Sequence, residues 1–123
     1  MELPRNAMLL RIFLGEADEL DGEPVFRKIV FKAREMNLAG ATVLRGPLGF
    51  GRSSHLHASN ILRLSTDLPI VIEMVDTEEK IREFLAAVES IVGPGLITLE
   101  KVQAIFYKAK SPNERPKSKR AAD

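Results

Sequence analysis

The chain has 123 residues, of which 45% are hydrophobic and 28% are charged, and it contains no cysteine. This length and composition fit one globular domain that can bury a core, and the missing thiols exclude disulfides and cysteine-ligated metal sites. No apolar run approaches the roughly 20 residues that span a bilayer. We therefore expect no membrane insertion and a cytoplasmic protein.

The formal net charge of +1 is unevenly distributed along the chain. Residues 108–123 hold six basic and two acidic residues and no apolar residue larger than alanine after Tyr107. We predict one folded domain over residues 1–107 and a basic, disordered C-terminal tail over residues 108–123. Such a tail can contact nucleic acid or anionic lipid, although a solvated end without a specific role is the favoured interpretation.

The first half of the chain predicts a strand, a helix and a second strand. Met8–Gly15 alternates in the way of a buried strand, and Asp18–Glu23 is a polar turn. A helix is expected from Pro24, with apolar residues at helical spacing as far as Met36. Ala41–Leu44 is then predicted as a strand that leads into a glycine-rich segment.

A second helix has the clearest amphipathic pattern in the chain. Asp76 or Thr77 caps its start, and with Asp76 at the N-cap Glu79 would complete a capping box. Its apolar stripe ends at a Gly-Pro-Gly sequence at residues 93–95, which stops the helix.

Further strands are predicted on both sides of this second helix. Ile61–Leu64 indicates the start of a strand that Ile70–Val75 continues after an interruption, and Leu96–Tyr107 is the last strand. The order β-α-β-β-α-β is typical of the α+β, ferredoxin-like fold, in which two helices cover one face of a four-stranded antiparallel sheet. The other face would carry apolar residues such as Val75 and Ile105, and association between copies of the chain would bury it.

The segment from Gly40 to Arg52, GATVLRGPLGFGR, carries the clearest functional signal. Arg45 and Arg52 bracket three glycines in this segment. Glycine lets backbone N–H groups converge and arginine supplies a fixed cationic fork, so the combination can hold a phosphate or a carboxylate. A glycine-rich turn without a ligand is an equal alternative. A P-loop is disfavoured, because no helical pattern follows the glycines.

Three other features bear on possible chemistry. His55 and His57 can share one side of an extended backbone, but two surface histidines are favoured over a metal site. Glu73 interrupts an apolar strand, either as a solvent-facing or subunit-facing charge or as a polar anchor in a ligand cleft. No arrangement of acid, base and nucleophile is evident, so we do not expect an enzyme.

Four segments, LLRIFLGE, GATVLRGPLGFG, LPIVIEMVD and GLITLEKVQ, resemble a bacterial and archaeal family of PII-like proteins labelled domain of unknown function 190. The resemblance covers Met8 to Tyr107 and is looser towards the PII nitrogen-regulatory proteins themselves. PII proteins are ferredoxin-like homotrimers that bind ATP or ADP in clefts between subunits. The resemblance implies that Arg52–Asn60 lies in their regulatory loop, to which a protein partner would bind.

The resemblance also implies ligand-binding residues. The sequence from Gly49 to Arg52 matches the start of the PII loop, Glu73 matches a glutamate of its third strand, and Gly93–Ile97 lies at its phosphate-binding loop. Pro94 and Leu96 stand where PII has an aspartate and a lysine, so a triphosphate would lose a cation there. With Arg45 added, the predicted ligand-binding residues are Arg45, Gly49, Phe50, Gly51, Arg52, Glu73, Gly93 and Gly95.

We therefore predict a PII-like signalling or regulatory protein that binds a nucleotide or another small anionic ligand at clefts between subunits. The predicted assembly is a homo-oligomer, with a trimer favoured by the resemblance. An adenine nucleotide is the candidate ligand, and no other cofactor is assigned. The alternative is a ligand-free module that binds a protein or nucleic acid through its loop or its tail.

Overall fold

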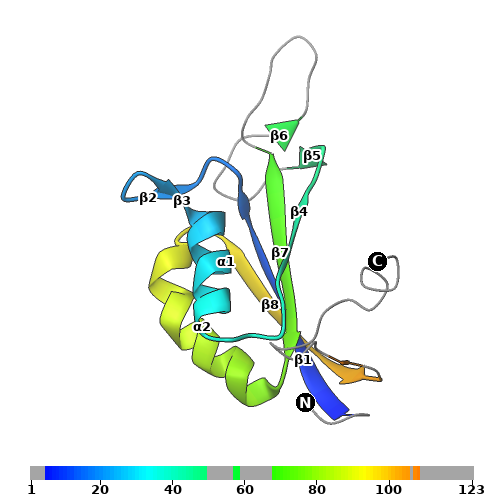
Figure 1. Cartoon of the computed structure of the whole chain (residues 1–123). Helices are drawn as coiled ribbons and strands as arrows, with labels where there is room; N and C mark the ends of the chain where they lie inside the picture. Colours follow the sequence, from blue (N-terminus) through cyan, green and yellow to red (C-terminus); the bar gives the residue numbers. More distant parts are fainter. Residues whose placement is uncertain (1–4, 50–56, 59–67, 106, 109–123) are drawn as a thin grey trace, which may run out of the picture.

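Four strands of the chain form one antiparallel sheet. The computed structural model describes residues 5–49, 57–58, 68–105 and 107–108. The sheet has the strand order β4-β7-β1-β8, and two helices cover one of its faces (Figure 1). These elements are β1 (Arg5–Gly15), α1 (Val25–Glu35), β4 (Thr42–Arg45), β7 (Pro69–Asp76), α2 (Glu78–Val92) and β8 (Leu96–Ala104). The predicted ferredoxin-like α+β fold is confirmed.

Two short ladders lie at one end of this sheet (Figure 1). One is formed by β2 (Glu19–Leu20) and β3 (Glu23–Pro24) inside the predicted polar turn, and the other by β5 (Leu48–Gly49) and β6 (His57–Ala58). The first ladder turns at an Asp-Gly pair, residues 21 and 22, whose φ angles are 55° and 79°. Asp and Gly tolerate this left-handed backbone, which matches the twist of a tight hairpin.

Helix α1 begins directly after Pro24, as predicted. Pro24 is the N-cap residue and has an extended backbone. The N–H at this position makes no hydrogen bond within a helix, so its absence in proline costs α1 nothing. The helix buries Val25, Ile29 and Ala33 at helical spacing. The chain leaves the helix through Asn37, whose φ of 60° ends the helical path.

Helix α2 is capped by Thr77, whose hydroxyl accepts a hydrogen bond from Lys80 N at 3.2 Å. The alternative cap at Asp76, with Glu79 completing a capping box, is wrong. The buried carboxylate of Asp76 instead accepts hydrogen bonds from the backbone N–H groups of Ala39 at 2.8 Å and Thr77 at 2.7 Å. Asp76 therefore joins the segment after α1 to the end of β7.

Strand boundaries differ from the predicted ones by a few residues. β1 starts at Arg5 because its first, polar residues pair with the end of β8. This pairing is made by the backbone, so the apolar pattern did not reveal it. β4 is shifted by one residue, so that Arg45 lies in the strand, and β8 ends at Ala104, before Tyr107. The predicted strand start at Ile61–Leu64 lies outside the described residues.

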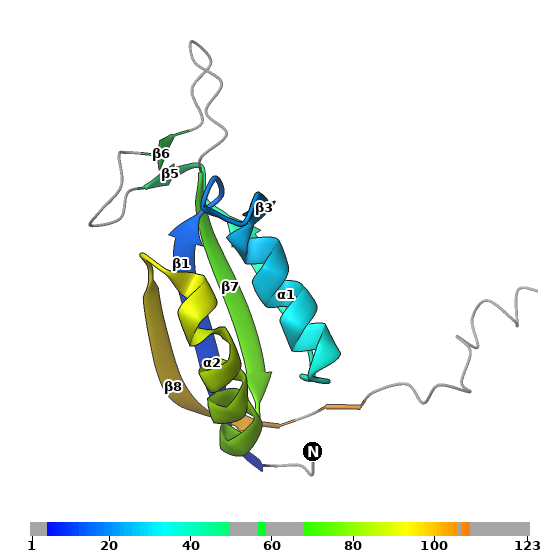
Figure 2. The same cartoon turned by 90° about the vertical axis from the view of Figure 1, so that its left-hand side faces the viewer.

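The core lies between the helices and the facing side of the sheet. Figure 2 shows α1 and α2 side by side in front of the strands. Alternate residues of β1 and β7 point into this layer, as a period of two requires. The fully buried large side chains are those of Leu10, Ile12, Ile29, Ile70, Ile72, Met74, Ile81, Phe84 and Val88. No described helix is long and apolar enough to cross a membrane.

The opposite face of the sheet carries an apolar row. The strand register places Leu44, Val71, Phe13 and Leu96 next to one another across all four strands. Leu44 is 47% exposed and Leu96 is 57% exposed, and no described helix covers them. Val75 of β7 is 38% exposed on the same face, so the face is partly apolar, as predicted, whereas the exposed Ile105 lies beyond the end of β8 and is not part of it. We call this surface, centred on Leu44, Val71, Phe13 and Leu96, the open face.

Candidate ligand-binding site

The predicted site residues that the structure describes divide between the end of the sheet and its centre. Arg45 is the last residue of β4, Gly49 lies beyond it in β5, and Gly93 and Gly95 precede β8. The register brings the ends of β1 and β4 beside the starts of β7 and β8. These four residues therefore lie towards the same end, which we call the sheet end, whereas Glu73 lies in the middle of β7.

Glycines at the sheet end let the chain pass closely around Pro69. Gly46 N donates a hydrogen bond to Pro69 O at 2.8 Å. A Cβ atom added to Gly46 would lie 3.0 Å from Pro69 Cγ, and one added to Gly49 would lie 3.2 Å from it. Packing alone thus gives these positions a reason to be glycine, besides any contact with a ligand.

The Gly-Pro-Gly sequence before β8 approaches β1 even more closely. A Cβ atom at Gly95 would lie 2.8 Å from the backbone oxygen of Phe13, and neither backbone can yield without moving a strand. Gly93 has a φ of 61°, a value that disfavours residues with a Cβ atom. These two glycines thus set the turn that returns the chain from α2 to the sheet.

Arg45 already has an anionic partner within the chain. Its Nη2 donates to Oε2 of Glu16, the residue that follows β1. The Glu16 side chain is 22% exposed and that of Arg45 is 54% exposed. Glu16 N also donates to Leu68 O at 2.8 Å, which holds the glutamate backbone at the start of β7. The guanidinium predicted to bind an anion is therefore paired with a carboxylate of its own chain.

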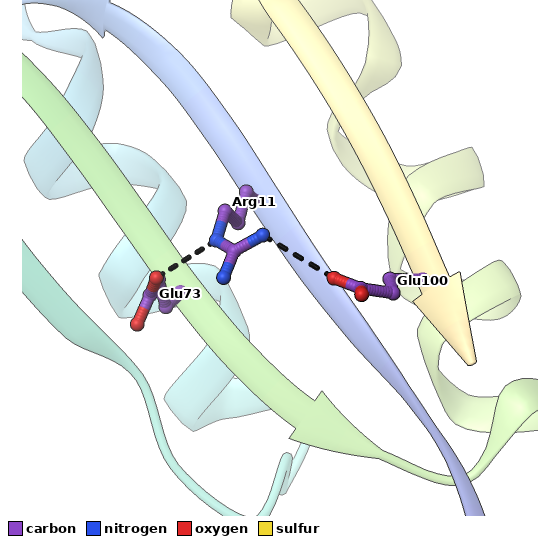
Figure 3. A network of polar contacts seen from close by, with 3 residues as sticks. All are labelled: Arg11, Glu73 and Glu100. Atoms are coloured by element: carbon purple, nitrogen blue, oxygen red, sulfur yellow. Dashed lines mark hydrogen bonds and ion pairs between the residues drawn. The ribbon is translucent and has the colours of Figure 1, made fainter. Parts of the chain in front are cut away.

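Glu73 belongs to a network at the centre of the open face (Figure 3). Arg11 Nε donates to Glu73 Oε2 at 2.9 Å, and Arg11 Nη1 donates to Glu100 Oε1 at 3.4 Å. The hydrogen bond that Arg11 donates to Glu73 raises the pKa of Arg11, although desolvation opposes the shift. The guanidinium is thus charged at every pH near neutrality, and Glu73 faces the open side of the sheet with Arg11 as its partner.

Arg11, Glu16 and Glu100 were not among the predicted residues. Arg11 interrupts the apolar run of β1 in the same way that Glu73 interrupts the run of β7. Two opposite charges, each in the middle of a neighbouring strand, are a signal that could have predicted their contact. Glu16 offers no such signal, because its position depends on how the chain turns after β1.

Several predicted residues lie outside the described part of the chain. Phe50, Gly51 and Arg52 are among these residues, as is His55. His57 is described only as part of strand β6. Among the described residues, no group of three or more histidine, aspartate or glutamate side chains could hold a metal ion.

The described part of the chain has hollows outside the predicted site residues, two of which are well lined. One lies between α2 and β8, and the other lies near the start of β1. The first is lined by Arg82, Leu85, Ala86, Glu89 and Ile97, and the second by Asn6, Ala7, Met8, Glu78, Lys101, Val102 and Gln103. Neither hollow is lined by a predicted site residue.

Comparison of the sequence with known families gives one match over most of the chain. The model of the family DUF190, described as "Uncharacterized ACR, COG1993", matches residues 7–104. A UPF0166 protein of Aquifex aeolicus strain VF5 is 41% identical over 100 residues, which are 80% of this chain and 92% of that protein. A UPF0166 protein of Methanocaldococcus jannaschii is 37% identical over 95 residues, 76% of this chain and 87% of its own.

Solved structures with a similar fold are PII-like proteins. CPII of Thiomonas intermedia K12, described as a nitrogen regulatory PII-like protein bound to ADP, AMP and bicarbonate, superposes with a TM-score of 0.62 at 16% identity. The match covers 81% of this chain and 89% of CPII. A protein of Thermus thermophilus described as PII-like and signalling gives a TM-score of 0.58 at 14% identity, covering 81% of this chain and 90% of its own. At these identities the likeness shows the fold alone.

Proposed function

The chain belongs to the DUF190 family, and we propose that it is a PII-like regulatory protein that binds a nucleotide or another small anionic ligand between copies of itself. In this proposal it is a cytoplasmic protein without catalytic activity. The observation that carries the proposal is the sheet end of a PII-like fold, where Arg45 and Gly49 lie at the β4 edge and Gly93 and Gly95 lie at the β8 edge, with β7 and β1 between them.

The chemistry of the sheet end supports an anionic ligand. An arginine supplies parallel N–H donors that match a phosphate or a carboxylate. The neighbouring glycines keep the backbone free of side chains where a ligand would approach. CPII, whose fold is similar, is described as bound to ADP, AMP and bicarbonate, and these three compounds are therefore the first ligands to test.

The open face supports assembly of several copies. Leu44 and Leu96 leave about half of their surface exposed at its two edges, and Phe13 and Val71 lie between them. Covering such a row removes apolar surface from water, which stabilises an oligomer. We propose a homotrimer, on the resemblance to PII, whose subunit boundaries run along the sheet ends and complete the ligand site.

A thermal-shift panel tests the ligand proposal. The purified protein is melted with ATP, ADP, AMP, cyclic nucleotides, bicarbonate and divalent metals, and we expect a saturable rise in melting temperature with an adenine nucleotide. Calorimetric titration of the best ligand should then show weaker binding by Arg45→Gln. Arg27→Gln is the matched control, because Arg27 is an exposed arginine on α1. Equal affinity of both variants would contradict the assignment of Arg45.

A second candidate function rests on the pairing of Arg45 with Glu16. If that pair is permanent, the sheet end lacks a free cation among its described residues, and the chain is a ligand-free interaction module. No compound of the panel would then stabilise it. Deleting residues 111–123 tests the tail in that case, because loss of binding with a strong dependence on salt would indicate nucleic acid.

A further inference from the structure

We propose that Glu16 is an internal competitor of the ligand for Arg45, and that it makes the sheet end select anions of low charge, such as a carboxylate or a monophosphate, over triphosphates. This inference rests on the proposed ligand-binding function and names the class of ligand. It assigns a specificity-determining role to a residue that contributes no contact of its own to the ligand.

The competition follows from how firmly Glu16 is held. It follows β1 directly, and its N–H is bonded to Leu68 O at 2.8 Å, so its carboxylate stays within reach of Arg45. Its side chain is only 22% exposed, so part of the cost of removing the carboxylate from water has already been met on folding. A ligand in solution must therefore displace a partner whose effective concentration is high.

The preference for low charge follows from the charges at the sheet end. Besides Glu16, Asp18 lies there, and its carboxylate accepts a hydrogen bond from Gly15 N at 3.0 Å. Arg45 is the one cation that the described ion pairs place at this end, and two carboxylates lie at the same end. A ligand that takes Arg45 leaves Glu16 unpaired beside it, and each further negative charge on the ligand is repelled by both carboxylates.

The backbone N–H of Gly46 does not offset the repulsion between the ligand and the two carboxylates. Its N–H is already bonded to Pro69 O and is not free for an additional phosphate oxygen. Leu96, at the start of β8, is an exposed apolar residue and supplies no charge. Among the residues that the structure describes, selection therefore depends on the balance between Arg45 and the two carboxylates.

Glu16→Gln is the variant that tests the proposal, because it removes one charge and keeps the size of the side chain. We expect it to bind AMP about two- to fivefold more tightly than the natural protein, the scale on which an exposed ion pair contributes. The affinity for ATP should rise by about threefold more than the affinity for AMP, because Glu16 repels the more highly charged ligand more strongly. Calorimetric titrations of AMP, ADP and ATP at one low salt concentration measure both effects.

Two further variants make the result specific. Glu19→Gln removes the same charge from the neighbouring hairpin, where Glu19 has no described contact with Arg45, and it should change the affinities by less than about twofold. In the double variant Glu16→Gln with Arg45→Gln, the gain for AMP should disappear, because there is no guanidinium left to release. Melting of each variant without ligand verifies that it is folded.

The outcomes separate this inference from the proposed function. If neither the natural protein nor Glu16→Gln binds any of the three nucleotides, the proposed function is wrong and the inference falls with it. If the natural protein binds them through Arg45 but Glu16→Gln leaves all affinities and their order unchanged, the inference alone is wrong. Equal gains for Glu16→Gln and Glu19→Gln would also overturn it, since net charge would then explain them.

Discussion

The molecule contains two arginine–glutamate contacts whose surroundings differ. At the sheet centre Arg11 is held between Glu73 on β7 and Glu100 on β8, and the strand register fixes all three. At the sheet end Arg45 meets Glu16, which lies beyond the last residue of β1. The same two residue types can therefore form part of a rigid surface in one place and an exchangeable pair in another.

This difference assigns separate roles to the two regions. The centre of the open face presents a fixed charge pattern within an apolar surface, which suits a contact between copies of the chain. The sheet end presents a cation with a partner that a ligand can replace. Substitutions at the sheet end should therefore leave self-association largely unchanged, and substitutions on the open face should leave nucleotide affinity unchanged as long as the copies remain associated.

The largest expected effect is loss of assembly on substituting the open face. Leu44→Asp combined with Leu96→Asp places two charges in the apolar row, and burying unpaired charges is costly. We expect a monomer in sedimentation velocity with an unchanged far-ultraviolet circular dichroism spectrum. Phe31→Asp is the control, because Phe31 is 60% exposed on α1, on the helix side of the sheet. A double variant that sediments like the natural protein would show that the open face is not the interface.

A second effect concerns the stability of the sheet end. Gly95→Ala puts a Cβ atom 2.8 Å from Phe13 O, and we expect it to lower the free energy of unfolding by about 1–3 kcal/mol, as overpacking does. Gly40→Ala is the matched control, since no atom lies within 4 Å of its added Cβ. Urea unfolding measures both variants. Equal stability of the two would contradict the close approach of this turn to β1.

The elements of the fold were predictable because their signals are local. Apolar periodicity located both helices and the buried strands, and the order of the elements indicated the sheet. The cap of α2 was harder, since Asp76 and Thr77 are both good N-cap residues; the Thr77 hydroxyl accepts from Lys80 N, while the Asp76 carboxylate accepts from Ala39 N, far along the chain. Interactions over a long separation in sequence have no local signature.

The candidate site shows the same division. The glycines and Arg45 were visible as a pattern, and the antiparallel order of the strands places Gly93 and Gly95 at the same end of the sheet but at its opposite edge. The partner of Arg45 was not predictable, because Glu16 reaches it through the turn after β1. The sequence alone therefore indicated an anion site but not the carboxylate that competes for it.

A third prediction compares the substitution of one arginine in each of the two regions. Arg11→Gln leaves Glu73 and Glu100 without their shared cation on the open face, and we expect weaker self-association but nucleotide affinity within about twofold for the remaining oligomer. Arg45→Gln should do the reverse. Dilution series in sedimentation velocity, beside calorimetric titrations, measure the two properties. Loss of self-association by Arg45→Gln, or loss of nucleotide affinity by the Arg11→Gln oligomer, would show that the two regions do not have separate roles.

The pH dependence of assembly gives a fourth, smaller test. A raised pKa means that Arg11 contributes its charge below its ordinary pKa and loses it only as the pH rises through the raised value, far above neutrality. Between about pH 7 and pH 9 the charge of Arg11 is therefore constant. We expect the dissociation constant of the oligomer to vary less than about twofold over this range. A steep change would show that another group governs the interface.

The smallest effect is expected far from both regions. Arg82 and Glu78 form an exposed i,i+4 pair on α2 at 3.0 Å. Arg82→Gln should cost about 0.3–0.5 kcal/mol of stability and leave assembly and nucleotide affinity unchanged. Urea unfolding and the titrations used above measure this, and the variant sets the background against which the effects of Arg11 and Arg45 are judged. A loss of nucleotide binding here would place the site in the hollow beside α2 instead.

Native mass spectrometry of the protein with ADP is the decisive experiment for a ligand site between copies of the chain. We predict a trimer that carries up to three nucleotides, and a Leu44→Asp, Leu96→Asp monomer that carries none at the same concentration. Binding of ADP by that monomer with the affinity of the natural protein would contradict the claim that the ligand site at the sheet end is completed between copies of the chain.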